Sequence, residues 1–205
     1  MAAAEHDSVE TYIEEGLLAV IPVYEEGSKT VILTLKGRRL EPRSLIWLVK
    51  KIASHYDLDL VSLRRRCGEL LNLKHHISLP MSEGLVLLPV RSRRAIAAGD
   101  ITIGYINLKE VKEIAASEAE SDKGDKDPDV PLSVVTFNSG TELVTFNTAE
   151  KLNQRLEQGE KVLRDFLRRR SRGARFSGVK REDLAEKMPD CDCLLLELFM
   201  ERFGL

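Results

Sequence analysis

Aromatic residues are scarce in this chain of 205 residues, and no long apolar run is present. Phe, Tyr and Trp together make up 5% of the chain, and Trp47 is the single tryptophan. The core is therefore expected to consist mainly of Leu, Ile and Val. A membrane-spanning helix needs about 20 consecutive apolar residues, and nothing here approaches that length. The opening residues MAAAEHDSVE lack the basic region that begins a signal peptide, so no membrane partner is expected.

Cysteine is also rare, with only Cys67, Cys191 and Cys193. An odd number of cysteines, two of them two positions apart, is a poor disulfide framework and indicates a reducing, cytoplasmic compartment. Cys191 and Cys193 lack the second ligand pair that a structural zinc site needs, and the adjacent His75 and His76 have no cysteine or carboxylate at ligand spacing. We therefore expect neither a metal site nor a cofactor.

Recognisable catalytic motifs are missing as well. The sequence has no glycine-rich phosphate loop, no GxSxG motif and no HExxH motif. Cys67 follows three arginines, which favour a thiolate, but no His–acid partner can be assigned to it. The sequence therefore predicts a protein that is not an enzyme.

What the chain does contain is enough apolar material for a folded core and a strongly uneven distribution of charge. Hydrophobic residues make up 43% of the chain, which excludes global disorder. The net charge of −2 conceals a basic block of +9 at residues 29–109 and another of +6 at 161–175, separated by acidic blocks. A polyanion responds to local charge over a Debye length of ~8 Å, so a nucleic-acid surface is possible. The alternative is that both blocks are ordinary solvated surface.

The periodicity of apolar residues predicts an α+β fold, in which a small β-rich domain contains inserted helices. We expect strands at residues 17–24, 30–35, 84–88, 101–108, 130–137 and 142–146, and helices at residues 44–56, 60–71, 148–170, 182–187 and 192–202. Residues 111–115 continue as a strand or form a short helix. Asp57 or Asp59 is expected to cap the second helix, and Asn147 or Thr148 the long one. Residues 36–39 are expected to form a basic turn and residues 170–178 a basic hinge.

Three parts follow from this pattern. Residues 1–11 are expected to be a flexible N-terminus, and residues 12–170 a β-rich domain with an acidic loop at 117–129 and a closing helix at 148–170. Residues 171–205 are expected to form the hinge and a helical tail. The loop is polar, contains Gly and Pro, and lies between strand patterns, so it reads as an insertion within a sheet.

The basic residues are the best candidates for a binding site. They flank proline-bounded strands and loops, where a rigid scaffold usually presents its binding groups. Arginines in such loops contact phosphates or guanine edges. The candidates are Arg64, Arg65, Arg66, Lys74, His75, Arg91, Arg93 and Arg94. We expect these residues to converge on one cationic surface in the folded chain.

The order of these elements resembles a known family. The runs KHHISLPMSEGLVLLPVRS, GYINLKEVKEI and VTFNSGTELVTFN, followed by a helix, resemble the competence transcription factor ComK family and the related LytTR DNA-binding domain. The shared pattern is a His-containing basic segment, a strand between Pro80 and Pro89, and an aromatic-containing strand that leads to Asn107. The terminal LLLELFMERFG also resembles the C-terminal helix of ComK proteins.

This resemblance covers roughly residues 12–170 and implies a transcriptional regulator that binds promoter DNA as an oligomer. Our first hypothesis is therefore a DNA-binding regulator whose partners are double-stranded DNA and a second copy of itself. The alternative is a non-enzymatic adaptor or regulatory subunit, which would bind a regulatory protein partner through its acidic segments and its apolar C-terminal helix.

Overall fold

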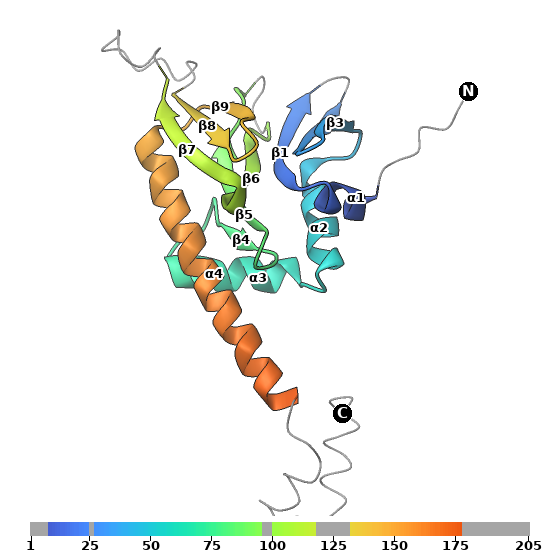
Figure 1. Cartoon of the computed structure of the whole chain (residues 1–205), viewed down its shortest axis with the longest axis vertical. Helices are drawn as coiled ribbons and strands as arrows, with labels where there is room; N and C mark the ends of the chain where they lie inside the picture. Colours follow the sequence, from blue (N-terminus) through green and yellow to red (C-terminus); the bar gives the residue numbers. More distant parts are fainter. Residues whose placement is uncertain (1–7, 25–26, 96–99, 118–131, 178–205) are drawn as a thin grey trace, which may run out of the picture. The chain divides into compact units, whose positions relative to one another are not determined.

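A computed structural model describes residues 8–24, 27–95, 100–117 and 132–177 of the chain. These residues form an α+β fold built mostly from antiparallel strands, which confirms the predicted class (Figure 1). The chain divides into two compact units, residues 1–163 and residues 164–205, and the last helix contributes to both. The expected tail helices at 182–187 and 192–202 lie outside the described residues.

The larger sheet has six strands in the order β3-β2-β1-β6-β5-β4, and every neighbouring pair is antiparallel. Its strands are β1 (Leu17–Tyr24), β2 (Ser28–Thr34), β3 (Gly37–Glu41), β4 (Leu79–Pro80), β5 (Val86–Arg91) and β6 (Ile103–Asn107). The strands expected at residues 17–24 and 30–35 are confirmed as β1 and β2, which pair as an antiparallel hairpin. The strand expected at 84–88 begins later and runs through Pro89 to Arg91.

The third strand corrects the expected basic turn at residues 36–39. Residues from Gly37 onward pair with β2 as β3, and only Lys36 and its neighbours form the turn. The charge of Arg39 is compensated within the fold, because its Nη2 lies 2.5 Å from Oε1 of the buried Glu15. Two of the three cations in the expected turn therefore lie beside the same buried acid, since Lys36 Nζ is also 3.6 Å from Glu15 Oε1.

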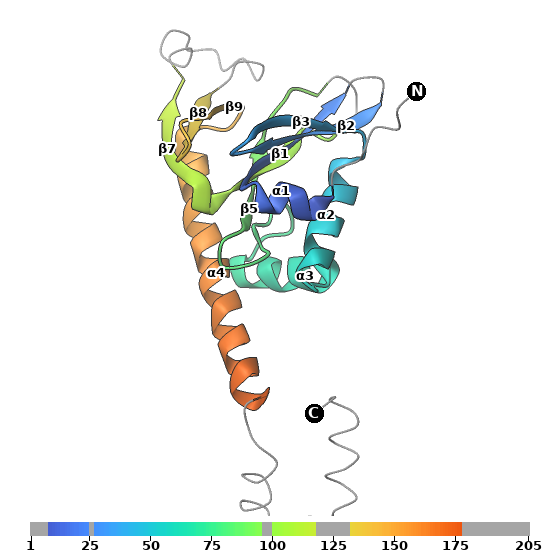
Figure 2. The same ribbon diagram turned by 45° about the vertical axis from the view of Figure 1, so that its right-hand side comes forward.

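Three helices accompany the larger sheet: α1 (Val9–Glu14), α2 (Leu45–His55) and α3 (Leu60–Leu71). Figures 1 and 2 show them together below β1–β3, and α1 and α2 contact β1 and β2 while α3 contacts β4. Helices α2 and α3 were predicted, and Asp59 rather than Asp57 caps α3 through a 2.6 Å bond from Ser62 N. Helix α1 was not predicted; Ser8 caps it, and Tyr12 anchors it by donating to Glu41 Oε2.

The smaller sheet contains β7 (Val111–Ala116), β8 (Ser133–Phe137) and β9 (Glu142–Thr145) in that order. The β8–β9 hairpin was predicted around the sequence Asn-Ser-Gly, and Gly140 adopts a φ of +82° there. Residues 111–116 form the strand rather than the short helix. The acidic loop expected at 117–129 falls between β7 and β8 in the chain, and all of it except Ser117 lies outside the described residues.

Helix α4 (Ala149–Ser177) closes the described chain. Thr148 is its N-terminal cap, because its Oγ1 accepts from Lys151 N at 3.3 Å. The expected hinge at 170–178 is wrong as far as Ser177, since the helix continues through it. Arg, Ser and Ala support a helix, and the single Gly173 costs only ~1 kcal/mol relative to Ala.

Leu, Ile and Val dominate the core, as their abundance over aromatics predicted. Fully buried side chains include Leu18, Ile32, Leu48, Ile52, Leu63, Leu88 and Ile106. Helix α4 approaches this core at Gly159, where an added Cβ would lie 2.5 Å from side-chain atoms of Leu88 and Leu108. Glycine at that position allows the helix to pack directly on β5.

Gly104 is required for the close contact of β6 with β1. A Cβ at this position would lie 2.8 Å from the carbonyl oxygen of Val20, and backbone cannot move aside as a side chain can. We expect Gly104→Ala to lower the free energy of unfolding by about 1–3 kcal/mol, the usual cost of overpacking. Urea denaturation measures this, with Gly84→Ala as the matched control because that position has open space around it. Equal stability of the two variants would contradict the packing argument.

Candidate functional site

An open groove along α3 holds three of the predicted basic residues. Arg64 and Arg65 on the helix and Lys74 in the following turn line it, and all three are exposed. The other lining residues are Gly68, Glu69, Asn72, Leu73 and Ile77, and the groove has a volume of about 540 Å³. Arg66 is half-buried and does not line the groove. The fold thus brings Arg64, Arg65 and Lys74 together in one groove.

The chain reverses at the end of α3, and this reversal places Lys74 opposite the arginines. Asn72 adopts a left-handed φ of +54°, and Leu73 N then donates to Gly68 O at 2.9 Å. A Cβ on Gly68 would lie 2.8 Å from Leu73 O, so the chain can fold back this tightly only over a glycine. Gly68, which weakens the helix by sequence criteria, is therefore the residue that shapes the groove.

Beyond Lys74 the turn approaches the first half of α4. Burial lowers the pKa of His76, and the positive charges of Arg155 and Lys151 on α4, together with His75, lower it further. These charges act on His76 only because the turn and the helix are neighbours. Residues 74–76 and α4 therefore share one positively charged region of the surface.

Arg155 is the least expected member of this region. Its side chain is 6% exposed, and its Nη1 donates to Pro89 O and, at 3.3 Å, to Asn147 Oδ1. Both acceptors are neutral, and no carboxylate pairs with Arg155 among the residues that the structure describes. Burial lowers the pKa of this guanidinium, although an arginine remains charged at neutral pH. The result is a positive field that the local structure leaves uncompensated.

Arg91, Arg93 and Arg94 correct the expectation of a single cationic surface. They follow the far end of β5, whereas α3 contacts β4, which pairs with the beginning of β5. The Arg93 guanidinium donates to Ile101 O and lies 3.4 Å from Asp100 Oδ2, and it lines a separate cavity of about 160 Å³. Arg91 lies over the Phe146 ring at 5.9 Å, and Arg94 is exposed. None of the three lines the groove along α3.

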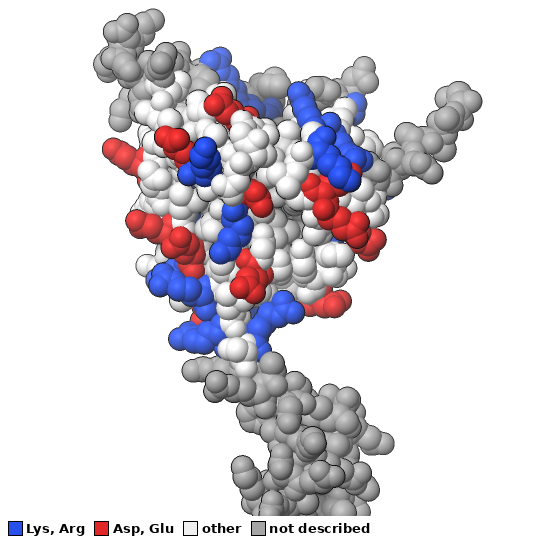
Figure 3. Space-filling view, viewed as in Figure 1, with Lys and Arg blue, Asp and Glu red and all other residues white. Residues whose placement is uncertain are grey.

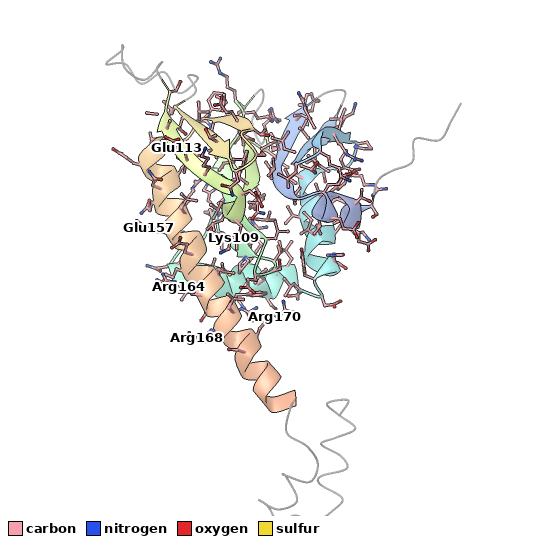
Figure 4. All side chains as sticks on the ribbon, in the orientation of Figure 1. Lys109, Glu113, Glu157, Arg164, Arg168 and Arg170 are labelled. Carbon is pink, nitrogen blue, oxygen red and sulfur yellow. The ribbon has the colours of Figure 1, made fainter. Side chains whose placement is uncertain are left out.

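Other surfaces carry charge of both signs. Figure 3 shows acidic and basic side chains mixed over the face turned to the viewer, and Figure 4 places Lys109, Glu113 and Glu157 on it. The register of the smaller sheet puts Glu113, Thr136 and Glu142 side by side across its three strands. Two carboxylates in one row repel phosphates, so this part of the sheet does not suit a polyanion.

Most of the second basic block, from Arg164 onward, belongs to the second unit. Arg168 and Arg169 both donate to Asp165 at 2.6 Å, and Arg170 lies over the Phe166 ring. Burial raises the pKa of Asp165, but the hydrogen bonds and charges of the two arginines outweigh it and lower the pKa. Figure 4 shows Arg164, Arg168 and Arg170 along this half of α4. Two of these cations therefore neutralise an acid on their own helix.

Asn107 and Asn147, which the sequence offered as a motif residue and a helix cap, hold the scaffold together. Asn107 Nδ2 donates to Leu17 O and Gly84 O, and its Oδ1 accepts from Val86 N. Asn147 Oδ1 accepts from Arg91 N at 2.6 Å. Their amide groups substitute for missing backbone partners, so both side chains have a structural role.

His76, Lys151 and Arg155 are the residues of this region that sequence reasoning missed. For Arg155 a signal was present, because the apolar stripe of α4 contains it between Leu152 and Gly159. An arginine within the buried stripe of a helix needs a polar partner in the core. The partner, Pro89 O, lies 66 positions away and could not be identified from the sequence.

No protein-family model, curated protein or solved structure matches this chain. Within the described residues, no group of three or more His, Cys, Asp or Glu side chains could hold a metal ion. Cys191 and Cys193 lie outside those residues. No helix in the same part of the chain is long and apolar enough to cross a membrane.

We expect Asn147→Ala to lower the free energy of unfolding by about 2 kcal/mol. The substitution leaves the Arg91 N–H without its 2.6 Å acceptor and removes one of the two acceptors of buried Arg155. Urea denaturation measures the loss, and Asn153→Ala, at an exposed position of the same helix, is the control. If the two variants are equally stable, the asparagine does not hold the edge of β5.

The pKa of His76 reports the positive field directly. We expect NMR titration to give a pKa below the ordinary 6.5, and Lys151→Ala to raise it because one of the cations is removed. Because the pKa of His76 is lower in the folded chain than in the unfolded chain, the unfolded chain takes up the imidazole proton more readily. The free energy of unfolding therefore falls as the pH decreases from above 6.5 through the folded-state pKa of His76. Lys161→Ala on the same helix is the control, and a pKa at or above 6.5 would disprove the proximity.

Proposed function

We propose that this chain is a non-enzymatic DNA-binding transcriptional regulator of the ComK type, which contacts the phosphate backbone through the groove along α3. The observation that carries the proposal is the groove itself, where Arg64, Arg65 and Lys74 converge from two segments of the chain. Of the other ionisable side chains, only Glu69 lines it. The resemblance of the runs around Pro80, Pro89 and Asn107 to ComK and LytTR proteins supports the same function.

The adjoining part of α4 extends the positive region. Lys151 is exposed, and the buried Arg155 adds a charge whose described partners are neutral. A phosphate in this region would meet cations from α3, from the turn at 74–76 and from α4. Arginine and lysine contacts of this kind position a protein on DNA without reading its sequence. The proposal assigns base recognition to no residue. Arg93 is paired with Asp100 and takes no part in the proposed phosphate contact.

The salt dependence of binding tests the phosphate contacts. If the groove neutralises about three phosphates, log affinity should fall with log salt with a slope of roughly −3. Fluorescence anisotropy with a mixed-sequence duplex of 40 base pairs, between 50 and 250 mM KCl, measures the slope. The triple variant Arg64→Ala, Arg65→Ala, Lys74→Ala should weaken binding at least about tenfold and reduce the slope by about 3, since each lost phosphate contact reduces it by about 1.

The matched control removes exposed cations elsewhere. Arg38→Ala with Lys112→Ala changes the net charge on β3 and β7, away from the groove, and should leave both affinity and slope nearly unchanged. Circular dichroism should show that both variants are folded, because all five side chains are exposed. A flat salt response of the wild-type chain, or equal losses in the two variants, would exclude the groove as a DNA interface.

A further inference from the structure

Helix α2 presents a second, outward face that the proposed DNA contact does not use. Its inner residues Leu45, Leu48, Val49, Ile52 and Ala53 are buried in the core. Ile46, Trp47, Lys50, Lys51 and Ser54 follow on the opposite side at helical spacing. Ile46 is 54% exposed and Trp47 is only half-buried. An aromatic and a large aliphatic residue on the outside of a helix, beside two lysines, indicate a binding surface.

This face borders a groove of about 820 Å³ between α2 and the beginning of α1. Its lining residues are Ser8, Val9, Glu10, Arg43, Trp47, Lys51, Ser54 and His55. Two cations lie near the indole of Trp47, with the Arg43 guanidinium 4.1 Å and Lys51 Nζ 5.8 Å from the ring centroid. We refer to this groove between α2 and α1 below as the Trp47 groove.

The Trp47 groove is held in shape before any ligand binds. Arg43 Nε lies 3.7 Å from Glu41 Oε1, and the backbone N–H of Arg43 donates to the same oxygen at 3.2 Å. The other oxygen of this buried carboxylate accepts from Tyr12 on α1. Arg43 is therefore fixed beside the ring, and binding need not order it.

The chemistry of the groove selects an acidic peptide rather than a duplex. Arg43 and Lys51 attract carboxylates, and the accessible part of the half-buried Trp47 ring suits an apolar or proline side chain. The phosphate backbone of a duplex offers no apolar side chain to this ring. Glu10, whose side chain is 67% exposed and whose Oε1 lies 3.8 Å from His55 Nδ1, is available to a basic residue of a mostly acidic peptide.

One segment of the chain has this composition. Residues 118–131 contain six acids and two lysines, and they end in Asp127-Pro128-Asp129-Val130-Pro131. Two prolines beside carboxylates match an indole beside cations. The segment is attached to β7 and β8 of the smaller sheet, whereas α2 contacts β1 and β2 of the larger one, and Figures 1 and 2 both show these elements on different sides of the unit.

We propose that the acidic segment 118–131 of one copy of the chain binds the Trp47 groove of a second copy. Every copy carries one groove and one segment at different places, so the contact is heterologous and joins copies head to tail. It uses none of the groove residues along α3, and it therefore stands or fails independently of DNA binding.

The first test uses Trp47 as its own reporter, since it is the single tryptophan of the chain. A synthetic peptide of residues 117–132 should change the emission of the full-length chain saturably, and 500 mM salt should weaken the effect because carboxylates and cations form the contact. A peptide with its acids replaced by Asn and Gln is the control and should bind at least about tenfold more weakly. No response, or an equal response to both peptides, overturns the proposal. A response seen only after deletion of residues 1–7 assigns the groove to the N-terminus and also overturns it.

The second test separates the two halves of the contact. Lys50→Glu with Lys51→Glu disables the groove at exposed positions, and Asp122→Asn, Asp125→Asn, Asp127→Asn, Asp129→Asn disables the segment. In sedimentation velocity at low salt, the wild-type chain should form dimers and longer species as its concentration rises, and each variant alone should stay monomeric.

An equimolar mixture of the two variants should restore dimers and nothing larger, because one intact groove and one intact segment remain. Arg38→Ala with Lys112→Ala should assemble like the wild type. Monomeric wild-type protein at about 100 μM, or a mixture that stays monomeric, would disprove head-to-tail association. If the variant Lys50→Glu, Lys51→Glu still binds DNA, a failure of head-to-tail association is distinguished from a failure of the proposed DNA binding.

Discussion

The free edge of β5 is the constraint on which the arrangement of both sheets depends. β4 pairs only with Val86 and Leu87, so the rest of this edge would be left with unpaired backbone groups. The segment after β9 satisfies them: Phe146 N donates to Arg91 O, Asn147 accepts from Arg91 N, and Arg155 donates to Pro89 O. Pro89, which has no N–H, is tolerated on the same edge because nothing there requires its donor. These bonds, together with the packing of α4 on β5 at Gly159, attach the second sheet and α4 to the first sheet.

This attachment has an electrostatic consequence. Arg155 on α4 donates to the edge of β5, and this contact places its guanidinium in the core beside neutral oxygens. The charge of Arg155 then acts on the neighbouring turn that carries His75 and His76. The turn itself is positioned by the reversal over Gly68 and Asn72, which also brings Lys74 to the arginines of α3. The positive region is thus built from structural residues as much as from exposed ones. Such a region attracts phosphate without any catalytic group.

The groove along α3 and the Trp47 groove, to which we assign binding, differ in the arrangement of their charged side chains. The groove along α3 is open, and cations from separate segments gather there with a single acid. The Trp47 groove places cations around an aromatic ring and keeps Glu10 at its margin. The first arrangement suits a uniform polyanion, and the second suits a peptide in which acids alternate with apolar residues. The two proposed interactions would therefore use distinct faces of one small α+β unit.

Local signals were sufficient to predict the α+β class, the strands β1, β2, β8 and β9, the helices α2 and α3 and the beginning of α4. Periodicity, turn residues and caps such as Asp59 and Thr148 are encoded within a few neighbouring positions. The same signals missed α1 and β3, whose stability comes from Tyr12 bonding Glu41 and from Arg39 meeting Glu15 across distant segments. Only the tertiary structure decided which arginines share a surface: it joined Lys74 to Arg64 and Arg65, and it paired Arg93 with Asp100 elsewhere. Charge along a chain is a local property, whereas its neighbours in space are set by strand register and long-range packing.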